Sequence, residues 1–76
     1  MTRYFFDVKG KTSFEYDYKG LTLPSLEHAQ QMAELIATDL GCTRPDLAPQ
    51  AEVQIRSSHW KLLDTVSIKS IETLAA

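Results

Sequence analysis

The chain has 76 residues, a hydrophobic content of 43%, seven aromatic residues (three Phe, three Tyr and one Trp) and a formal net charge of −2. This length supports one hydrophobic core, so residues 1–76 are expected to form a single small domain, and the lone cysteine excludes an intrachain disulfide and a paired-cysteine zinc site. Without a basic excess, the composition disfavours a protein whose role is to neutralise phosphates, which makes nucleic acid a disfavoured partner.

The first two predicted elements form a β-hairpin. Over residues 3–9, Tyr4, Phe6 and Val8 occupy alternate positions, the two-residue period of a half-buried strand. A second alternating run covers residues 12–18 and follows a short connection that contains Gly10. Two such runs joined by a short glycine-containing segment predict a hairpin.

One amphipathic helix is predicted next. Pro24 disfavours helical geometry at the residue before it, and the hydroxyl of Ser25 can accept a hydrogen bond from a free amide of the first turn. Apolar residues recur at spacings of three and four from Leu26 to Leu40, and Gly41 is a typical C-terminal stop. The helix is therefore expected to begin after Ser25 and to end at Gly41.

The rest of the chain predicts a loop and a second hairpin. Residues 42–50 contain two prolines and no periodicity, whereas residues 51–56 alternate as a third strand and residues 61–69 as a fourth. Asp64 falls in the same phase as the apolar Leu62 and Val66. It is therefore an inward carboxylate with a partner, an edge residue, or the mark of a β-bulge that shifts the register.

Together these elements predict an α+β fold. The expected architecture is a four-stranded antiparallel sheet, in the order strand-strand-helix-strand-strand, with the helix packed on one face. The opposite face is expected to be mostly polar with two apolar members. It comprises Arg3, Phe5, Asp7, Gln54, Arg56, Leu63 and Thr65.

Short segments along the chain resemble the corresponding parts of a known family. They are Arg3-Tyr4-Phe5-Phe6-Asp7, then Gly20-Leu21, Leu23-Pro24 and Leu26-Glu27-His28-Ala29, and finally Glu52-Val53-x-Ile55-Arg56 and Leu63-x-Thr65-Val66-x-Ile68. In these the sequence is similar to a family of short bacterial proteins, abundant in alphaproteobacteria, that form a domain of unknown function. The family begins with a basic residue, an aromatic run and an aspartate. The resemblance implies the architecture predicted above and a cytoplasmic location, and it supplies no catalytic residue.

Two departures from the family pattern concern the second hairpin. The family turns there through acidic residues and glycine, whereas this chain has Ser57-Ser58-His59-Trp60, and Ser67 stands where the family's last strand often has proline. The turn geometry is therefore open. Trp60 is expected either to fold back over the core or to form an exposed contact surface with His59.

The residues with reactive side chains favour no particular chemistry. His28 is expected to be a surface residue of the first helical turn, and no sequence feature ties either His28 or His59 to Cys42 as a base. The carboxylates of Asp7 and Asp17 are expected to be solvated charges on strand faces, because so small a chain has little material for a catalytic cleft. We therefore expect no enzymatic activity, no metal and no cofactor.

The favoured hypothesis is a small protein-interaction module, because the chain is of marginal size, has a single cysteine and leaves strand edges unpaired. Its expected location is the cytoplasm, because the chain has one free thiol and no apolar run approaching the ~20 residues of a membrane span. Its partner is expected to be a second copy, held through a sheet edge or the face opposite the helix, or another protein. The candidate interaction surface comprises Arg3, Phe5, Arg56, Trp60 and Leu63.

Two other functions stay open. One is a nucleic-acid-binding domain that uses the aromatic residues of the first hairpin. The other is a small enzyme or metal-binding protein that involves His28, His59 or Cys42.

Overall fold

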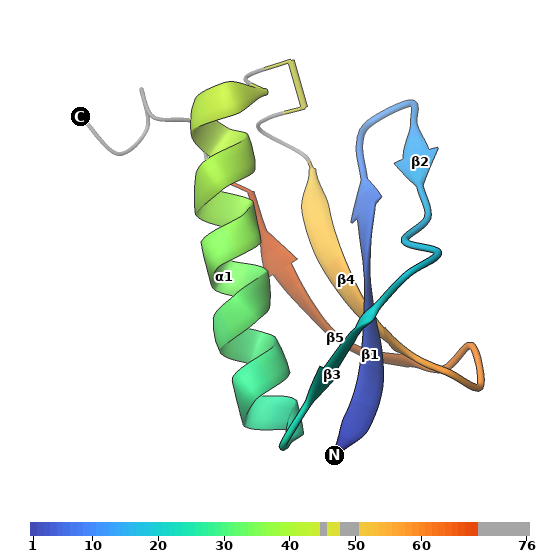
Figure 1. Ribbon diagram of the computed structural model, residues 1–76. Coiled ribbons are helices and arrows are strands. Elements are labelled where there is room, and N and C mark those ends of the chain that lie inside the picture. The colour runs from blue at the N-terminus through green and yellow to red at the C-terminus, as the bar shows by residue number, and fades with distance from the viewer. Residues whose placement is uncertain (45, 48–50, 69–76) are drawn as a thin grey trace.

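The computed structural model describes residues 1–44, 46–47 and 51–68. In this part of the chain one helix packs on one face of an antiparallel sheet of five strands (Figure 1). The α+β class and the single helix on one sheet face are confirmed. The predicted number of strands is wrong, because the described sheet has five strands instead of four.

The sheet is built around its first strand. Its members are β1 (Thr2–Lys9), β2 (Phe14–Glu15), β3 (Leu21–Leu23), β4 (Glu52–Ser57) and β5 (Leu62–Ser67). On one side β1 pairs with β4, which pairs in turn with β5, while β2 and β3 pair with the two ends of the other side of β1. The first strand, β1, and the later strand β4 therefore form the centre of the sheet.

The extra strand arises because the second predicted strand is interrupted. β2 is only two residues long, and the chain then bends through Asp17 and returns to β1 as β3, a strand that was not predicted. Gly20 makes this bend possible with a φ of +72°, and a Cβ atom there would stand 2.8 Å from the carbonyl oxygen of Tyr4. Only glycine fits such a position without strain.

The helix α1 (Leu26–Thr43) begins where the sequence predicts. Ser25 is its N-cap, since its Oγ accepts a hydrogen bond from the amide of His28. The predicted end at Gly41 is wrong, because the helix continues to Thr43. Gly41 is instead a buried packing position, four residues after Ala37 on the face that the helix turns toward the sheet.

The hydrophobic core lies between the helix and the sheet. Small side chains of α1 face larger side chains of the central strands, as close packing of a helix on a sheet requires. The buried apolar residues are Tyr4, Phe6, Ala29, Ala33, Ala37, Leu47, Ala51, Val53, Ile55 and Ile68. Tyr4 and Phe6 of the predicted inner face of β1 belong to this set, and Val8 is partly buried against it.

Strand β5 contains a bulge. Ile55 of β4 pairs with Asp64, but the next residue, Arg56, pairs with Leu62, so Leu63 is an extra residue in the ladder. The carboxylate of Asp64 accepts a hydrogen bond of 2.7 Å from the side chain of Gln30 on α1. Asp64 is thus an inward carboxylate with a partner, on an edge strand, beside a bulge.

The bulge also corrects the composition of the outer sheet face. Leu63 was expected there, but it packs against the core, and the outer position beside Arg56 belongs to Leu62, which is exposed. A bulge shifts the alternation of side chains by one residue, which is why strict two-residue periodicity assigned Leu63 to the wrong face.

Candidate functional site: an aromatic face over a buried ion pair

The outer face of the sheet holds a buried ion pair. Asp7 of β1 and Arg56 of β4 are 1% and 8% exposed, although the helix covers the other face. Nε of Arg56 donates to Oδ2 of Asp7 at 2.7 Å, and Nη2 of Arg56 donates to Oδ1 at 3.2 Å. This two-pronged geometry suits a guanidinium and a carboxylate and makes the pair both strong and directional.

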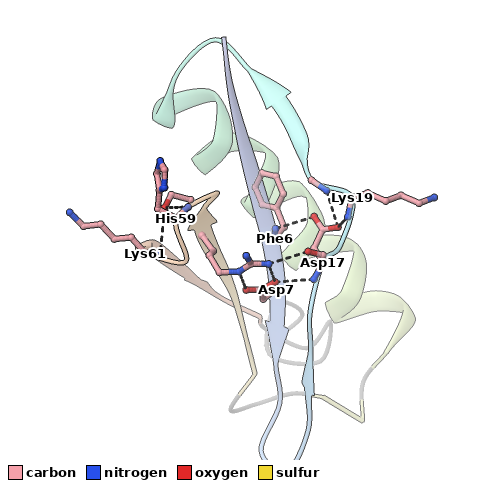
Figure 2. A network of polar contacts seen from close by, with 9 residues as sticks. Phe6, Asp7, Asp17, Lys19, His59 and Lys61 are labelled. Atoms are coloured by element: carbon pink, nitrogen blue, oxygen red, sulfur yellow. Dashed lines mark hydrogen bonds and ion pairs between the residues drawn. The ribbon is translucent and has the colours of Figure 1, made fainter.

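Asp17 connects this pair to the bend between β2 and β3. Its amide donates to Oδ1 of Asp7 at 2.9 Å, and its carbonyl oxygen accepts from Nη2 of Arg56 at 3.1 Å. Its own carboxylate accepts hydrogen bonds from the amides of Phe6, Lys19 and Gly20. Figure 2 shows Asp7 and Asp17 side by side within this network.

The carboxylate of Asp17 takes the place of a missing strand. Between the segments of β1 that pair with β2 and β3, the amide of Phe6 would lack a backbone partner, and Oδ2 of Asp17 accepts it at 3.2 Å. A backbone amide left unpaired in the interior would cost free energy. One side chain therefore completes the edge of the sheet where the chain bends away.

These contacts shift the ionisation of two groups. Burial by itself would raise the pKa of Asp17, but the hydrogen bonds from the Gly20, Phe6 and Lys19 amides outweigh it and lower this pKa. The hydrogen bond to Asp7 raises the pKa of Arg56 against the opposing effect of burial. Both groups are therefore charged at neutral pH.

Aromatic rings cover the guanidinium of Arg56. Its Cζ lies 4.7 Å from the ring centre of Phe5 and 4.1 Å from that of Trp60, both within the range of cation–π attraction. Tyr16 is farther away, at 6.0 Å, and its ring meets Trp60 edge to face with a centroid separation of 5.9 Å. The rings keep water away from an ion pair that the outer side of a two-layer fold would otherwise expose.

The rings continue along the first hairpin as one connected group. Tyr16 contacts Phe14 at a centroid distance of 4.6 Å and Tyr18 at 6.3 Å. Four of the side chains are exposed despite these contacts, and Tyr18 and Trp60 are the most exposed of them. We call this surface the aromatic face; it comprises Phe5, Phe14, Tyr16, Tyr18, Trp60 and Arg56.

Trp60 is placed by an unusual turn. The amide of Trp60 donates to the carbonyl of Ser57 and the amide of Ser57 to the carbonyl of Lys61, so residues 58–60 form a three-residue hairpin loop. Such loops consist of a type I turn followed by a residue with positive φ, usually glycine. Here that residue is Trp60, with a φ of 65°. A bulky side chain at a glycine position is a strained arrangement of the kind found at functional sites.

Four of the five predicted surface residues lie at or beside the aromatic face. Arg3 is exposed and donates from Nη1 to the carbonyl of Lys19, Phe5 is half-buried against Arg56, and Trp60 is exposed. Arg56 is buried beneath the rings instead of standing on the surface, and Leu63 lies on the helix side as described above. The open question about Trp60 is thus answered in favour of exposure.

The structure does not bring the reactive residues together. His28 lies in the first turn of α1 with Nδ1 2.8 Å from the Ser25 hydroxyl, whereas Cys42 is an exposed free thiol in the last turn. They are fourteen positions apart in the helix, which corresponds to about 21 Å along its axis. His59 lies in the turn between β4 and β5, outside the helix.

The predicted interaction surface omits Tyr16 and Tyr18, and Asp7 and Asp17, which were expected to be solvated, belong to the ion-pair network. The signal for the rings was present, because Phe14, Tyr16 and Tyr18 occupy one phase of the predicted second strand. No local sequence pattern predicts the ion pair, because Asp7 and Arg56 are 49 residues apart and meet only when β1 pairs with β4.

The described residues contain neither a metal-binding group nor a helix that could span a membrane. Over residues 1–44, 46–47 and 51–68, no group of three or more His, Cys, Asp and Glu side chains is arranged to hold a metal ion. In the same residues, no helix has the length and apolar character needed to cross a membrane.

Comparison with known proteins places the chain in a family. Residues 3–69 match the family described as Domain of unknown function (DUF6894). No curated protein and no solved structure matches the chain. The match confirms the expectation of a domain of unknown function that extends over nearly the whole sequence.

Proposed function

We propose that this chain, which belongs to the family Domain of unknown function (DUF6894), is a small protein-interaction module that binds its partner on the aromatic face. The observation that carries the proposal is the exposed ring of Trp60, held at positive φ against Arg56 and Tyr16. Trp, Tyr and Arg are the residues most enriched at the energetic centres of protein interfaces.

The exposure of these rings supports binding over a purely structural role. Trp60 is 65% exposed, so the burial that its ring gains in the isolated chain is small compared with the burial available under a partner. Its backbone nevertheless adopts a conformation that costs about 1–2 kcal/mol for a residue other than glycine. A function that needs an aromatic ring at this position accounts for that cost.

Self-association through the sheet edge is less well supported than binding on the aromatic face. β5 carries a bulge at Leu63 and an inward-pointing carboxylate at Asp64. Both features are devices by which proteins prevent an edge strand from pairing with another chain. A second copy bound on the aromatic face is instead an outcome of the experiment below.

The proposed module has no chemistry of its own and works in the cytoplasm. The distribution of His28, His59 and Cys42 over separate places in the fold supports the first statement. The exposed free thiol of Cys42 supports the second, because such thiols persist in reducing compartments.

The test is a quantitative pull-down from lysate of the source cells with three baits: the unchanged chain, Trp60→Gly and Leu35→Ala. Leu35 on α1 is a matched control, since it is as exposed as Trp60, at 65%. We expect a protein retained in amounts comparable to the bait by the unchanged chain and by Leu35→Ala. Trp60→Gly should retain about thirtyfold less, the effect of losing a hot-spot side chain worth about 2 kcal/mol.

Two results would contradict the proposal: retention of no protein in comparable amounts, or equal retention by Trp60→Gly. Sedimentation of the purified chain decides whether the partner is a second copy. A dimer that is lost in Trp60→Gly and kept in Leu35→Ala would identify the aromatic face as its interface.

A further inference from the structure

The charges around the aromatic face differ from those of the whole chain. The net charge of the chain is −2, yet three cations surround this face. The side chains of Lys19 and Lys61 extend away from the network on opposite sides (Figure 2), and Arg3 lies beside Lys19, to whose carbonyl it donates. Among the described residues, none of the three forms a salt bridge.

Three carboxylates on or beside the outer face of the sheet are already engaged. Asp7 binds Arg56, and Asp17 binds backbone amides. Glu15, on the neighbouring strand, pairs with Arg44 at 2.9 Å. The cations around the aromatic face are therefore available to charges that a partner would bring.

The excess acidic charge lies elsewhere on the molecule. Glu27, Glu34 and Asp39 are exposed on α1, which packs on the opposite face of the sheet. Negative charge on the helix side and free cations around the aromatic face give the domain a charge asymmetry. Complementary potentials across an interface determine which partners associate and how fast.

We propose that the partner segment held on the aromatic face is an acidic peptide segment. This inference rests on the proposed function and names the chemistry of the partner. Apolar side chains of the segment pack on the rings of Trp60 and Tyr16, and its Asp and Glu side chains face Arg3, Lys19 and Lys61. This is the usual anatomy of a protein interface, with an aromatic centre and a charged rim.

A second copy fits this surface poorly. Two aromatic faces placed against each other would bring the free cations of one copy toward those of the other. Asp7 and Asp17 are engaged, and Glu52 on the outer face of β4 lies opposite Lys9, at the end of β1 far from Arg3. Juxtaposed like charges across an interface disfavour association.

Nucleic acid fits it poorly as well. Arg56 is the cation in contact with the rings, and its Nε and Nη2 donate to Asp7 and to the carbonyl of Asp17. Its charge is matched by Asp7, so this guanidinium is not available to a phosphate. Stacking platforms for single strands instead combine aromatic rings with a positive groove that follows the backbone.

The test is a display selection from a random peptide library on the immobilised chain, with Trp60→Gly for counter-selection. We expect the enriched peptides to carry more Asp and Glu than the starting library. A synthetic copy of the most enriched peptide, chosen without tryptophan, is then titrated into the chain. Trp60 is the one tryptophan of the chain, so its emission should shift to shorter wavelength as the ring is covered.

Charge reversal tests the role of the cations. The variant Lys19→Glu with Lys61→Glu should weaken binding of this peptide about tenfold and reduce its dependence on salt. Lys11→Glu is the matched control, because Lys11 is an exposed lysine beyond the other end of β1. It should bind like the unchanged chain.

Several outcomes would overturn the inference, and they are distinguishable from failure of the proposed function. Enriched peptides that are neutral or basic, or no enrichment at all, would reject an acidic peptide, while the Trp60-dependent pull-down would still stand. An oligo-dT that perturbs Trp60 emission more strongly than the peptide, with steep loss on added salt, would replace the peptide by a nucleic acid. Loss of the Trp60 dependence in the pull-down would reject the proposed function itself.

Discussion

Replacing Trp60 by glycine and by alanine should give an unusual order of stability. At φ 65° a residue with a Cβ atom carries a cost of about 1–2 kcal/mol that glycine avoids. Both substitutions also remove the contacts of the indole ring. Those contacts are a cation–π interaction with Arg56 of about 0.5–1 kcal/mol and an edge-to-face pair with Tyr16 of about 0.5–1.5 kcal/mol.

The sum differs for the two variants. In Trp60→Ala the backbone cost stays and the contacts are lost, so the free energy of unfolding should fall by about 1–2.5 kcal/mol. In Trp60→Gly the relief of the backbone offsets most of that loss. The greater freedom of unfolded glycine costs about 0.4–1 kcal/mol and reduces the advantage. Trp60→Gly should therefore be more stable than Trp60→Ala by about 1 kcal/mol.

Urea denaturation followed by circular dichroism measures this difference. With a slope of about 1 kcal/mol/M for a small domain, the two midpoints should lie about 1 M apart. The control is the same pair of substitutions at Leu35, an exposed helical position, where glycine should be less stable than alanine by about 1 kcal/mol. If Trp60→Ala is as stable as Trp60→Gly, the positive φ imposes no strain and gives no reason to assign Trp60 a function.

Three further predictions concern the network beneath the rings. Asp7→Ala leaves the guanidinium of Arg56 buried without its partner, so the free energy of unfolding in denaturant should fall by about 3–5 kcal/mol. The double variant Asp7→Leu with Arg56→Met should recover much of this loss, and an equal loss in both variants would argue against a buried pair. Because the pKa of Asp17 is lowered in the folded chain, its contribution to stability is complete above the ordinary value near 4 and is lost as pH falls through the lower folded value. Thermal unfolding from about pH 2 to 6 should show this loss in the unchanged chain and a flatter profile in Asp17→Asn, and parallel profiles would contradict it. Gly20→Ala should lower the free energy of unfolding by about 2–4 kcal/mol, because φ is unfavourable for alanine and its Cβ would stand 2.8 Å from the carbonyl oxygen of Tyr4. A loss below about 0.5 kcal/mol would show that the bend adapts.

The sequence predicted the features that depend on local patterns. The period of two around Tyr4 and Phe6, the period near 3.6 along α1 and the cap at Ser25 each reflect interactions within a few residues, and the structure confirms all three. Gly41 shows the limit of such rules. A glycine can stop a helix, but here Gly41 is buried in line with Ala29, Ala33 and Ala37, and the helix continues past it to Thr43.

The features that the sequence did not predict depend on contacts between distant segments. A bulge was one of three alternatives for Asp64, and the sequence could not choose among them because the partner of Asp64, Gln30, is 34 residues away. The division of the second strand likewise depends on the carboxylate of Asp17, which binds the amide of Phe6 from 11 residues away. Periodicity carries no record of such long-range partners, so it assigned Leu63 and Asp17 to the wrong surroundings.

The candidate site and the stability of the fold depend on the same residues. One helix can cover only one face of the sheet, so the outer face of this two-layer domain needs another means of keeping its centre dry. Arg56 provides it, because its guanidinium binds Asp7 while its plane accepts the rings of Phe5 and Trp60. The rings are therefore held in place by a structural ion pair and are presented to solvent at the same time. A partner that covers Trp60 would remove more water from the Asp7–Arg56 pair, so the bound chain should have a larger free energy of unfolding than the free chain.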